Sequence, residues 1–336
     1  MQIAGEAGAK AGAGREGAHC LMGCFISMQR SPTLYPATTR HAQATGSGCD
    51  ELRPLQIVLA YNPEAGNFSL RRLARLRERL EQAGHAVAMA DSLAFRVPPV
   101  AGDVDLVCIV GGDGTVRTVI GQNRDAADNA AYCVYPAGTV NLLAREAGYP
   151  DDARAFVRRI SRSGARGQHF LGELNGQAFL CCASVGPDSA VVARVSPALK
   201  QRFGRFAYVI ALLRQLKDWP RRRMRVTVDG ADHDAEAVFI CKGRYYAGPW
   251  VIDDAADLRS GHFRVVLLDR ARRRDFLRLA LSAIISRRLA DPRWQRFSAQ
   301  EVEISTACAL PIQADGDILA TTPGVIRIAP EPVSFF

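Results

Sequence analysis

The stretch Asp105-Leu-Val-Cys-Ile-Val-Gly-Gly-Asp-Gly-Thr115 joins an apolar run to a glycine-rich segment. No polar residue alternates within Leu106–Val110, as expected of a strand that is buried on both faces of a parallel sheet. The three glycines that follow lack a Cβ, so the backbone can turn sharply and approach a bulky anion. Thr115 can then begin a helix whose free N–H groups face that anion. The stretch therefore predicts a buried strand that ends in a phosphate-binding loop.

Asp113 needs a separate explanation within this loop. A carboxylate among phosphate-binding N–H groups repels the ligand unless a magnesium ion or a hydroxyl group lies between them. No Gly-Lys-Ser/Thr follows, so the loop is not a Walker A loop, and its spacing differs from the Rossmann dinucleotide fingerprint. On this stretch alone, an ordinary strand-to-helix turn remains the alternative.

Length and composition indicate a globular protein. A chain of 336 residues that is 48% apolar can bury a sizeable core and is expected to form two domains. The formal net charge is +9, and the basic residues are nearly all arginine. This charge permits attraction to an anionic surface, although coding bias alone also explains heavy use of arginine.

The nine cysteines are odd in number, scattered and mostly set in apolar runs. This pattern favours reduced, buried thiols in a cytosolic protein, and no pair has zinc-finger spacing. No run approaches the ~20 apolar residues that span a bilayer. We therefore expect a cytoplasmic protein that is soluble or peripherally bound to a membrane, with no transmembrane segment.

The first half of the chain indicates a parallel α/β domain. Residues 1–52 have no hydrophobic periodicity and are predicted to be a disordered or low-complexity tail. Over residues 53–165, strand-like runs alternate with helical patterns, as in Leu55–Ala60 followed by a leucine-rich helix that ends at Gly84. Three glycine-bearing loops should then open at the same carboxyl edge of the sheet, where open α/β folds bind nucleotides.

The second half indicates a mainly antiparallel β domain over residues 166–320. Asn175-Gly176 and Asp229-Gly230 lie between strand-like runs and are strong hairpin signals. Apolar stripes at 199–216 and 275–289 predict inserted helices that pack on the sheet or contact a membrane. Residues 321–336 form a C-terminal segment that can return to the first domain.

Asp315-Gly316-Asp317 places two carboxylates around a glycine near the C-terminus. Such a turn can present both groups to one ligand, one as a proton acceptor and the other as a metal or water ligand. A plain hairpin turn explains the same residues, since Asp-Gly is common in turns.

Together these stretches resemble the diacylglycerol kinase catalytic domain family, which includes bacterial lipid kinases and is related to sphingosine and ceramide kinases. The resemblance runs from about residue 55 to the end of the chain. The family motifs appear as Asn62-Pro63-Glu64-Ala65-Gly66, Gly111–Thr115 and Pro136-Ala-Gly-Thr-Val-Asn141, and more loosely as Ser184–Asp188, Phe203–Tyr208, Tyr246–Trp250 and Asp315–Asp317, where the family has Asp-Gly-Glu.

The resemblance implies an ATP site between the α/β domain and a β-sandwich, and transfer of the γ-phosphoryl group to the hydroxyl of diacylglycerol or a related long-chain lipid at a membrane surface. It implies ATP and Mg²⁺ as cofactors, no nucleic-acid partner and no residue assigned as a direct metal ligand. It places the proton acceptor on Asp317 with Asp315 beside it, and Asp113 near the magnesium. The residues that it assigns to ATP binding are Asn62, Pro63, Glu64, Ala65, Gly66, Gly111, Gly112, Asp113, Gly114, Thr115, Gly138 and Thr139.

Three departures from the family pattern keep other functions open. Asp317 replaces glutamate, Arg117-Thr118 stand where the family has Asn-Glu, and Ser260-Gly261 replace the Asp-Gly of a structural magnesium site, so that ion is expected to be missing. These changes are the evidence for a catalytically silent nucleotide- or lipid-binding protein. A soluble-substrate kinase of the NAD kinase type is a third alternative, which the Asn-Pro-x-x-Gly and Pro-x-Gly-Thr-x-Asn motifs disfavour.

Overall fold

The computed structural model describes residues 54–98, 103–124, 129–162, 167–195, 211–212, 214–215, 219, 221–276 and 293–336. All of them belong to one compact unit, Glu51–Phe336. The predicted tail at 1–52 and most of the predicted helices at 199–216 and 275–289 lie outside the described residues.

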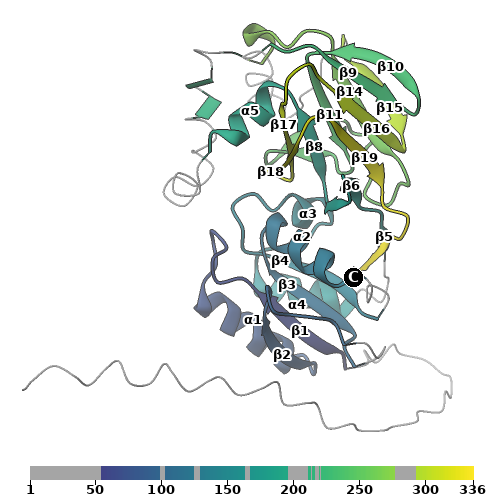
Figure 1. The fold of residues 1–336 in the computed structure, drawn as a ribbon. Coiled ribbons are helices and arrows are strands. Elements are labelled where there is room, and N and C mark those ends of the chain that lie inside the picture. The colour runs from purple at the N-terminus through teal and green to yellow at the C-terminus, as the bar shows by residue number, and fades with distance from the viewer. Residues whose placement is uncertain are drawn as a thin grey trace, which may run out of the picture. The chain divides into compact units, whose positions relative to one another are not determined.

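The first sheet has the strand order β2-β1-β3-β4-β20-β5 (Figure 1). Strands β1 to β4 and β20 are parallel, and only β5 runs antiparallel to its neighbour β20. The sheet confirms the predicted parallel α/β domain, and its last parallel strand comes from the C-terminal end of the chain. The strands are β1 (Gln56–Tyr61), β2 (Ala86–Asp91), β3 (Leu106–Gly111), β4 (Ala131–Pro136), β5 (Gly167–His169) and β20 (Val333–Phe335).

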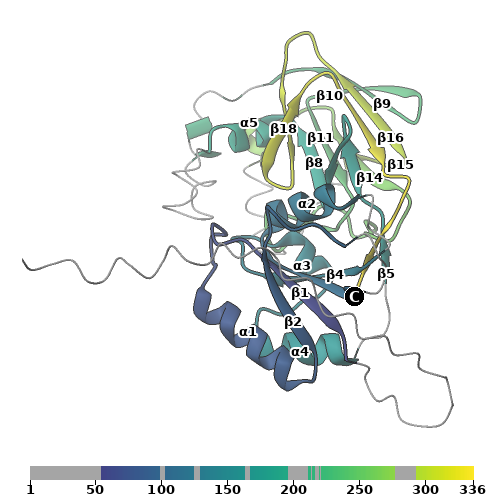
Figure 2. The ribbon, with the colours of Figure 1, turned by 60° about the horizontal axis from the view of Figure 1, so that its bottom comes forward.

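Helices cover both faces of this sheet, as Figure 2 shows. Helices α1 (Leu70–Gln82) and α4 (Ala153–Arg162) lie side by side on one face. Helices α2 (Asp113–Gln122) and α3 (Leu142–Glu146) lie on the other face, toward the second domain. The helices follow the leucine and valine periodicity, and Gly84 and Gly148 adopt the positive φ expected beyond a helix end.

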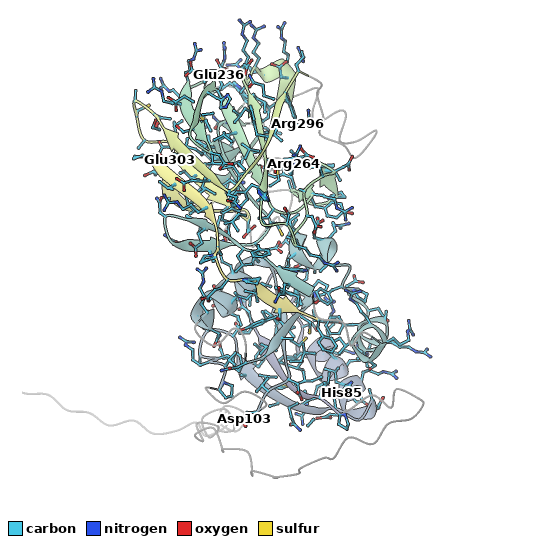
Figure 3. All side chains as sticks on the ribbon, turned by 90° about the vertical axis from the view of Figure 1, so that its right-hand side faces the viewer. His85, Asp103, Glu236, Arg264, Arg296 and Glu303 are labelled. Atoms are coloured by element: carbon cyan, nitrogen blue, oxygen red, sulfur yellow. The ribbon has the colours of Figure 1, made fainter. Side chains whose placement is uncertain are left out.

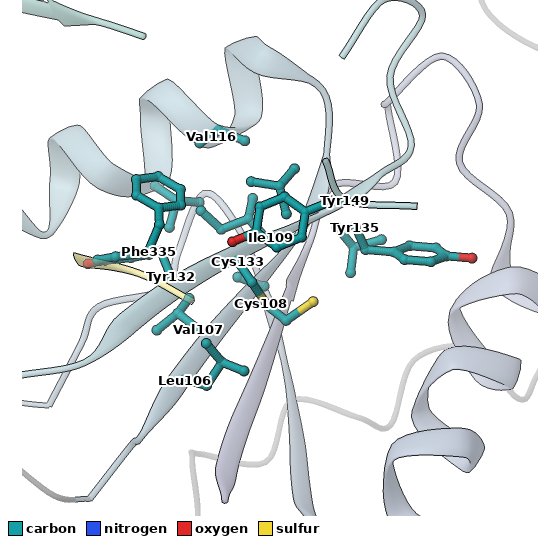
Figure 4. Close-up of a cluster of buried hydrophobic side chains, with 14 of the residues drawn as sticks. Leu106, Val107, Cys108, Ile109, Val116, Tyr132, Cys133, Tyr135, Tyr149 and Phe335 are labelled. Atoms are coloured by element: carbon teal, nitrogen blue, oxygen red, sulfur yellow. The ribbon is translucent and has the colours of Figure 1, made fainter. Parts of the chain in front are cut away.

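The core of the first domain is built around β3 and β4, in which every residue is buried. Figure 4 shows side chains of β3 packed with Tyr132 and Cys133 of β4 and with Phe335 of β20. Five of the six described cysteines are buried, and all six are free thiols. The unbroken apolar run of the sequence thus becomes a strand covered on both faces.

The second domain contains two six-stranded antiparallel sheets with the orders β10-β9-β16-β19-β6-β7 and β15-β14-β11-β8-β17-β18. Side chains from both sheets form one hydrophobic core, so the sheets make a sandwich. The elements are β6 (Gly172–Leu174), β7 (Gln177–Phe179), β8 (Cys182–Val185), α5 (Pro187–Ala193), β9 (Met224–Val228), β10 (Ala231–Ala235), β11 (Ala237–Cys241), β12 (Tyr245–Tyr246), β13 (Trp250–Val251), β14 (Phe263–Leu268), β15 (Gln295–Ala299), β16 (Glu301–Ser305), β17 (Pro311–Ala314), β18 (Asp317–Thr321) and β19 (Gly324–Ile328).

The predicted hairpins are present at β6–β7 and β9–β10. Both turn residues have positive φ in each, as a two-residue type I′ turn requires. On the other sheet, Figure 3 shows Arg264 and Arg296 on neighbouring strands, and both approach the carboxylate of Asp253.

Candidate active site

Three glycine-bearing loops meet at the carboxyl edge of the first sheet, after β1, β3 and β4. The backbone N–H of Asn67 donates to the Ala137 carbonyl at 2.8 Å, and its side-chain amide donates to the Gly138 carbonyl at 2.9 Å. A Cβ added to Gly138 would lie 2.5 Å from the Cα of Gly112. The second and third loops therefore touch backbone to backbone, which no other residue type permits at these positions.

The first loop is held against the second by Asn62. Its side-chain amide donates to the Thr115 hydroxyl at 3.0 Å, and its carbonyl oxygen Oδ1 accepts from the Glu64 backbone at 2.9 Å. A Cβ on Gly66 would lie 2.7 Å from the Thr139 hydroxyl of the third loop. The predicted ATP-binding residues are thus brought together at one edge of the sheet, which we call the glycine cradle: Asn62–Gly66, Gly111–Thr115 and Gly138–Thr139.

Helix α2 begins at this cradle. Its N-cap is Gly112, whose backbone is extended and which supplies no side-chain cap. The N–H groups of the first helical turn have no acceptor within the helix. Together with the helix dipole, they make this edge suited to a phosphate group.

Asp113 is buried and binds the start of the neighbouring helix. Its Oδ2 accepts from the Leu142 backbone N–H at 2.8 Å and its Oδ1 accepts from Leu143 at 3.0 Å. Burial, followed by the nearby charge of Asp315, raises the pKa of Asp113 to about 6. Both oxygens are therefore engaged in tying α2 to α3, a role that the sequence did not indicate.

Asp315 plays a similar part in the second domain. It is the first turn residue of the β17–β18 hairpin, with φ of 50°. Its carboxylate accepts from the backbone N–H groups of Leu180, Cys181 and Cys182 at 2.7, 2.8 and 3.2 Å. Burial raises its pKa as well. The Asp-Gly pair is thus a hairpin turn, as one interpretation of the sequence held, and its carboxylate anchors the entry to β8.

Asp317 is the accessible carboxylate of the three, with a side chain that is 39% exposed. A Cβ added to Gly114, in the first turn of α2, would lie 3.4 Å from Asp317 Oδ2. The predicted proton acceptor therefore lies directly beside the glycine cradle, although 203 positions separate Gly114 from Asp317 in the sequence.

Two residues with clear structural roles were missed as site residues. Arg117 donates from Nη2 to Asp317 Oδ2 at 3.0 Å, and Asn141 closes the third loop by hydrogen bonds to the N–H and the carbonyl of Gly138 at 2.8 and 2.9 Å. Signals for both exist in the sequence. Arg117 lies four residues after Asp113 on one helix face, and Asn141, with φ of 55°, ends the Pro-x-Gly-Thr-x-Asn motif.

Within the second domain, a chain of polar side chains leads from the hairpin turn to the start of α5. Gly316 N–H donates to Gln313, whose amide donates to the Ser184 hydroxyl at 2.7 Å. Ser184 and Tyr246 both donate to Asp188, whose pKa is raised by burial. Two loosely matched motifs, Ser184–Asp188 and Tyr246–Trp250, are therefore joined in space. Another loosely matched motif, Phe203–Tyr208, lies outside the described residues.

At the Ser260-Gly261 position a lysine supplies positive charge. Lys242 is fully buried, and its ammonium donates to the backbone carbonyls of Asp257, at 3.2 Å, and Ser260. Burial lowers the pKa of Lys242 to about 8. The segment that departs from the family's structural magnesium motif is thus held by an internal cation.

The cradle fits a nucleotide better than it fits a preformed metal cage. The N–H groups of the first turn of α2 have no acceptor within the helix, as phosphate binding requires. Within the described ranges, no three His, Cys, Asp or Glu side chains are grouped so that they could hold a metal ion. Mg²⁺ commonly keeps several waters and binds through one or two carboxylates and the phosphates of the nucleotide itself, so a preformed protein cage is not required for it.

The architecture is that of a two-domain α/β protein, with a glycine cradle on a parallel α/β sheet next to a β-sandwich. Residues 56–170 match the family model for the diacylglycerol kinase catalytic domain, and residues 181–336 match the YegS C-terminal NAD kinase beta sandwich-like domain. The chain thus contains a diacylglycerol kinase catalytic domain followed by a YegS-type C-terminal domain, and the two matches together cover most of residues 56–336.

Relatives agree with this assignment. A diacylglycerol kinase of Bacillus subtilis (strain 168) is 24% identical over 79% of this chain and 91% of its own length. A probable lipid kinase YegS-like of Pseudomonas aeruginosa is 26% identical over 81% and 93%. A crystal structure of a diacylglycerol kinase from Bacillus anthracis str. Sterne shares the fold, with a TM-score of 0.63, 19% identity, and coverage of 82% of this chain and 94% of that one. The names of the two sequence relatives support a kinase.

Proposed function

We propose that this protein is an ATP-dependent lipid kinase that phosphorylates the hydroxyl of diacylglycerol or a related long-chain lipid. The observation that carries the proposal is the position of Asp317 Oδ2 against Gly114, at the first turn of α2. Phosphoryl transfer requires bound phosphates, an acceptor hydroxyl in line with them and a base for its proton. A carboxylate beside a glycine cradle meets the first and third requirements.

In the proposed reaction Asp317 is the general base. The acceptor oxygen bonds to the γ-phosphorus while the bond from that phosphorus to the β,γ-bridging oxygen breaks, and its electron pair leaves with ADP. The acceptor proton moves to the Asp317 carboxylate and then to solvent. First-turn N–H groups of α2 and the cradle backbone hold the phosphates. Mg²⁺, when bound with the nucleotide, neutralises phosphate charge.

The named relatives favour a lipid as the acceptor, and a lipid would be met at a membrane surface. Among the described residues no helix is long and apolar enough to cross a membrane. We infer that the protein binds peripherally at the cytoplasmic face. The likeness of the second domain to the NAD kinase sandwich keeps a soluble acceptor as the competing outcome of the test.

Incubation with γ-labelled ATP, magnesium and a total lipid extract tests the proposal. Label in the organic phase supports it, whereas label on NAD identifies a soluble-substrate kinase, and ATP binding without turnover identifies a silent relative. We expect Asp317→Asn to lower turnover by roughly 10²- to 10⁴-fold with ATP affinity retained. Glu303→Gln, which changes an exposed carboxylate on β16, is the matched control. Full lipid kinase activity in Asp317→Asn would show that the base is another residue.

A further inference from the structure

Two departures from the family pattern are in direct contact. Arg117 lies on α2 of the first domain, and Asp317 opens β18 of the second. The guanidinium donates from Nη2 to Asp317 Oδ2 at 3.0 Å and from Nη1 to the Ala314 carbonyl at 3.3 Å. The side chain of Arg117 therefore hydrogen-bonds to Ala314 and Asp317, the residues on either side of the Asp315-Gly316 turn.

The contact between Arg117 and Asp317 is less exposed to water than an ordinary surface ion pair. The side chains of Arg117 and Asp317 are 19% and 39% exposed, so the pair is partly shielded from water. The charge of Arg117 also opposes the rise in pKa that burial causes at Asp113 and Asp315. Arg117 is thus a cation among three carboxylates at the edge where a polyanionic nucleotide is proposed to bind.

The rigid fork of arginine suits the task of orienting a carboxylate. Aspartate reaches one methylene less far than glutamate, so a base at position 317 needs its carboxylate held toward α2. Two guanidinium nitrogens, one on the turn backbone and one on Oδ2, fix both the turn and the carboxylate. Lysine, with a point charge on a flexible stem, cannot hold this two-point geometry.

We propose that Arg117 is a positioning residue for Asp317: it orients the shorter carboxylate beside the first turn of α2, so that the two departures from the family pattern act as one unit. This proposal rests on the proposed function, because Asp317 is the base in that reaction. Arg117 does not itself touch the reacting atoms.

A second ion pair from the same chain segment provides the control. Arg124, two residues beyond α2, pairs with Glu173 on β6 and so also links the two domains. It lies outside the glycine cradle and the hairpin turn. If Arg117 only holds the domains together, Arg124→Asn and Arg117→Asn should have equal effects.

The test compares Arg117→Asn, Arg117→Lys, Asp317→Glu, the double variant Arg117→Asn/Asp317→Glu and Arg124→Asn in the lipid kinase assay. We expect Arg117→Asn to lower kcat on the order of 100-fold, as a displaced catalytic group does, with the KM for ATP changed by less than about 3-fold. Arg117→Lys should be intermediate. Asp317→Glu alone should lower kcat, because the longer side chain meets Arg117, and the double variant should recover at least about tenfold over Arg117→Asn.

The outcomes separate this proposal from the proposed function. Wild-type kcat in Arg117→Asn, an equal loss in Arg124→Asn, or a double variant no better than the product of the single losses would overturn the positioning role and leave the lipid kinase intact. Full activity in Asp317→Asn would instead remove the base. A second readout does not depend on turnover. The double variant Arg117→Asn/Asp317→Asn should shift the urea unfolding midpoint by less than the sum of the shifts of the two single variants. A shift equal to that sum would contradict the ion pair.

Discussion

Asp113 and Asp315 use both carboxylate oxygens to accept backbone N–H groups, whereas Asp317 is partly exposed and pairs with a guanidinium. A buried carboxylate that accepts two or three backbone N–H groups is a structural tie, since these hydrogen bonds fix its orientation and connect separate segments. The three acids of the glycine-rich loop and the hairpin turn therefore divide into two ties and one candidate base. Chemistry is expected from the accessible group alone.

Asp113→Asn tests the first tie. Asparagine keeps one acceptor oxygen but presents an NH₂ group to a second backbone N–H, which leaves a buried donor unpaired. We expect a loss of about 1–3 kcal/mol in the free energy of unfolding and weaker ATP binding, because the third loop leads directly into α3, which Asp113 holds. Urea unfolding and calorimetric ATP titration measure the two effects. Unchanged stability would show that the hydrogen bonds to Leu142 and Leu143 contribute nothing.

The stability difference between the wild type and Asp113→Asn should depend on pH. Burial and Asp315 raise the pKa of Asp113 from 3.8 to about 6, so between these values the folded state binds more protons at this site than the unfolded state. As pH rises through about 6, Asp113 becomes charged in the buried site and the free energy of unfolding falls. As pH falls again through about 6, the carboxyl is protonated and this loss of stability disappears. Relative to Asp113→Asn, the wild type should gain stability between about pH 7 and pH 4. A stability difference that stays constant over this range would contradict the raised pKa.

At the scale of elements, the cradle depends on loops that approach each other more closely than side chains allow. The contact between Gly112 and Gly138 brings the loop after β3 against the loop after β4. The parallel order β1-β3-β4 places the ends of these strands next to each other. Asn67 and Asn141 then fix the third loop by hydrogen bonds to its backbone.

Gly138→Ala should open the cradle. The added Cβ would lie 2.5 Å from the Gly112 Cα, and backbone on that side cannot move without separating the loops. We expect ATP affinity to fall by about tenfold or more while the sheet stays folded. Gly121→Ala is the matched control: it lies on α2 with open space around it, and alanine should stabilise the helix by roughly 0.5–1 kcal/mol. Equal ATP affinity in both variants would exclude the cradle as the nucleotide site.

At the scale of the described molecule, side-chain contacts connect the two domains near the candidate site. Besides Arg117 and Arg124, Glu146 at the end of α3 is 6% exposed and accepts from the side chain and backbone of Arg244 at 2.8 and 3.0 Å. It also accepts from the Tyr245 backbone at 3.3 Å. A buried carboxylate with three donors couples the α/β domain to the segment after β11.

Glu146→Gln should weaken this coupling. The amide retains one acceptor and turns an NH₂ group toward the donors of residues 244 and 245, so we expect a loss of about 1–3 kcal/mol in the free energy of unfolding. Urea unfolding followed by circular dichroism measures it. Glu331→Gln, at an exposed carboxylate, should change stability by less than about 0.5 kcal/mol. Indistinguishable unfolding curves for the two variants would mean that this contact does not couple the domains.

Local chemistry was enough to predict several elements of this fold. The apolar run before Gly111 became a fully buried strand, and Asn175-Gly176 and Asp229-Gly230 became hairpin turns. These features depend on the φ/ψ freedom of a few neighbouring residues and on the period of burial, which a short stretch of sequence contains. The meeting of three glycine loops at one sheet edge follows from the same pattern, because parallel strands end on the same side.

Only the tertiary structure decided which aspartate remains accessible and which cation orients it. Arg117 and Asp317 are 200 positions apart, and Asp315 finds its donors more than 130 positions away. Periodicity and turn chemistry act over a few residues, so they give Asp315 and Asp317 the same description. The folded chain separates them because burial and hydrogen-bond partners depend on which distant segments pack against the turn.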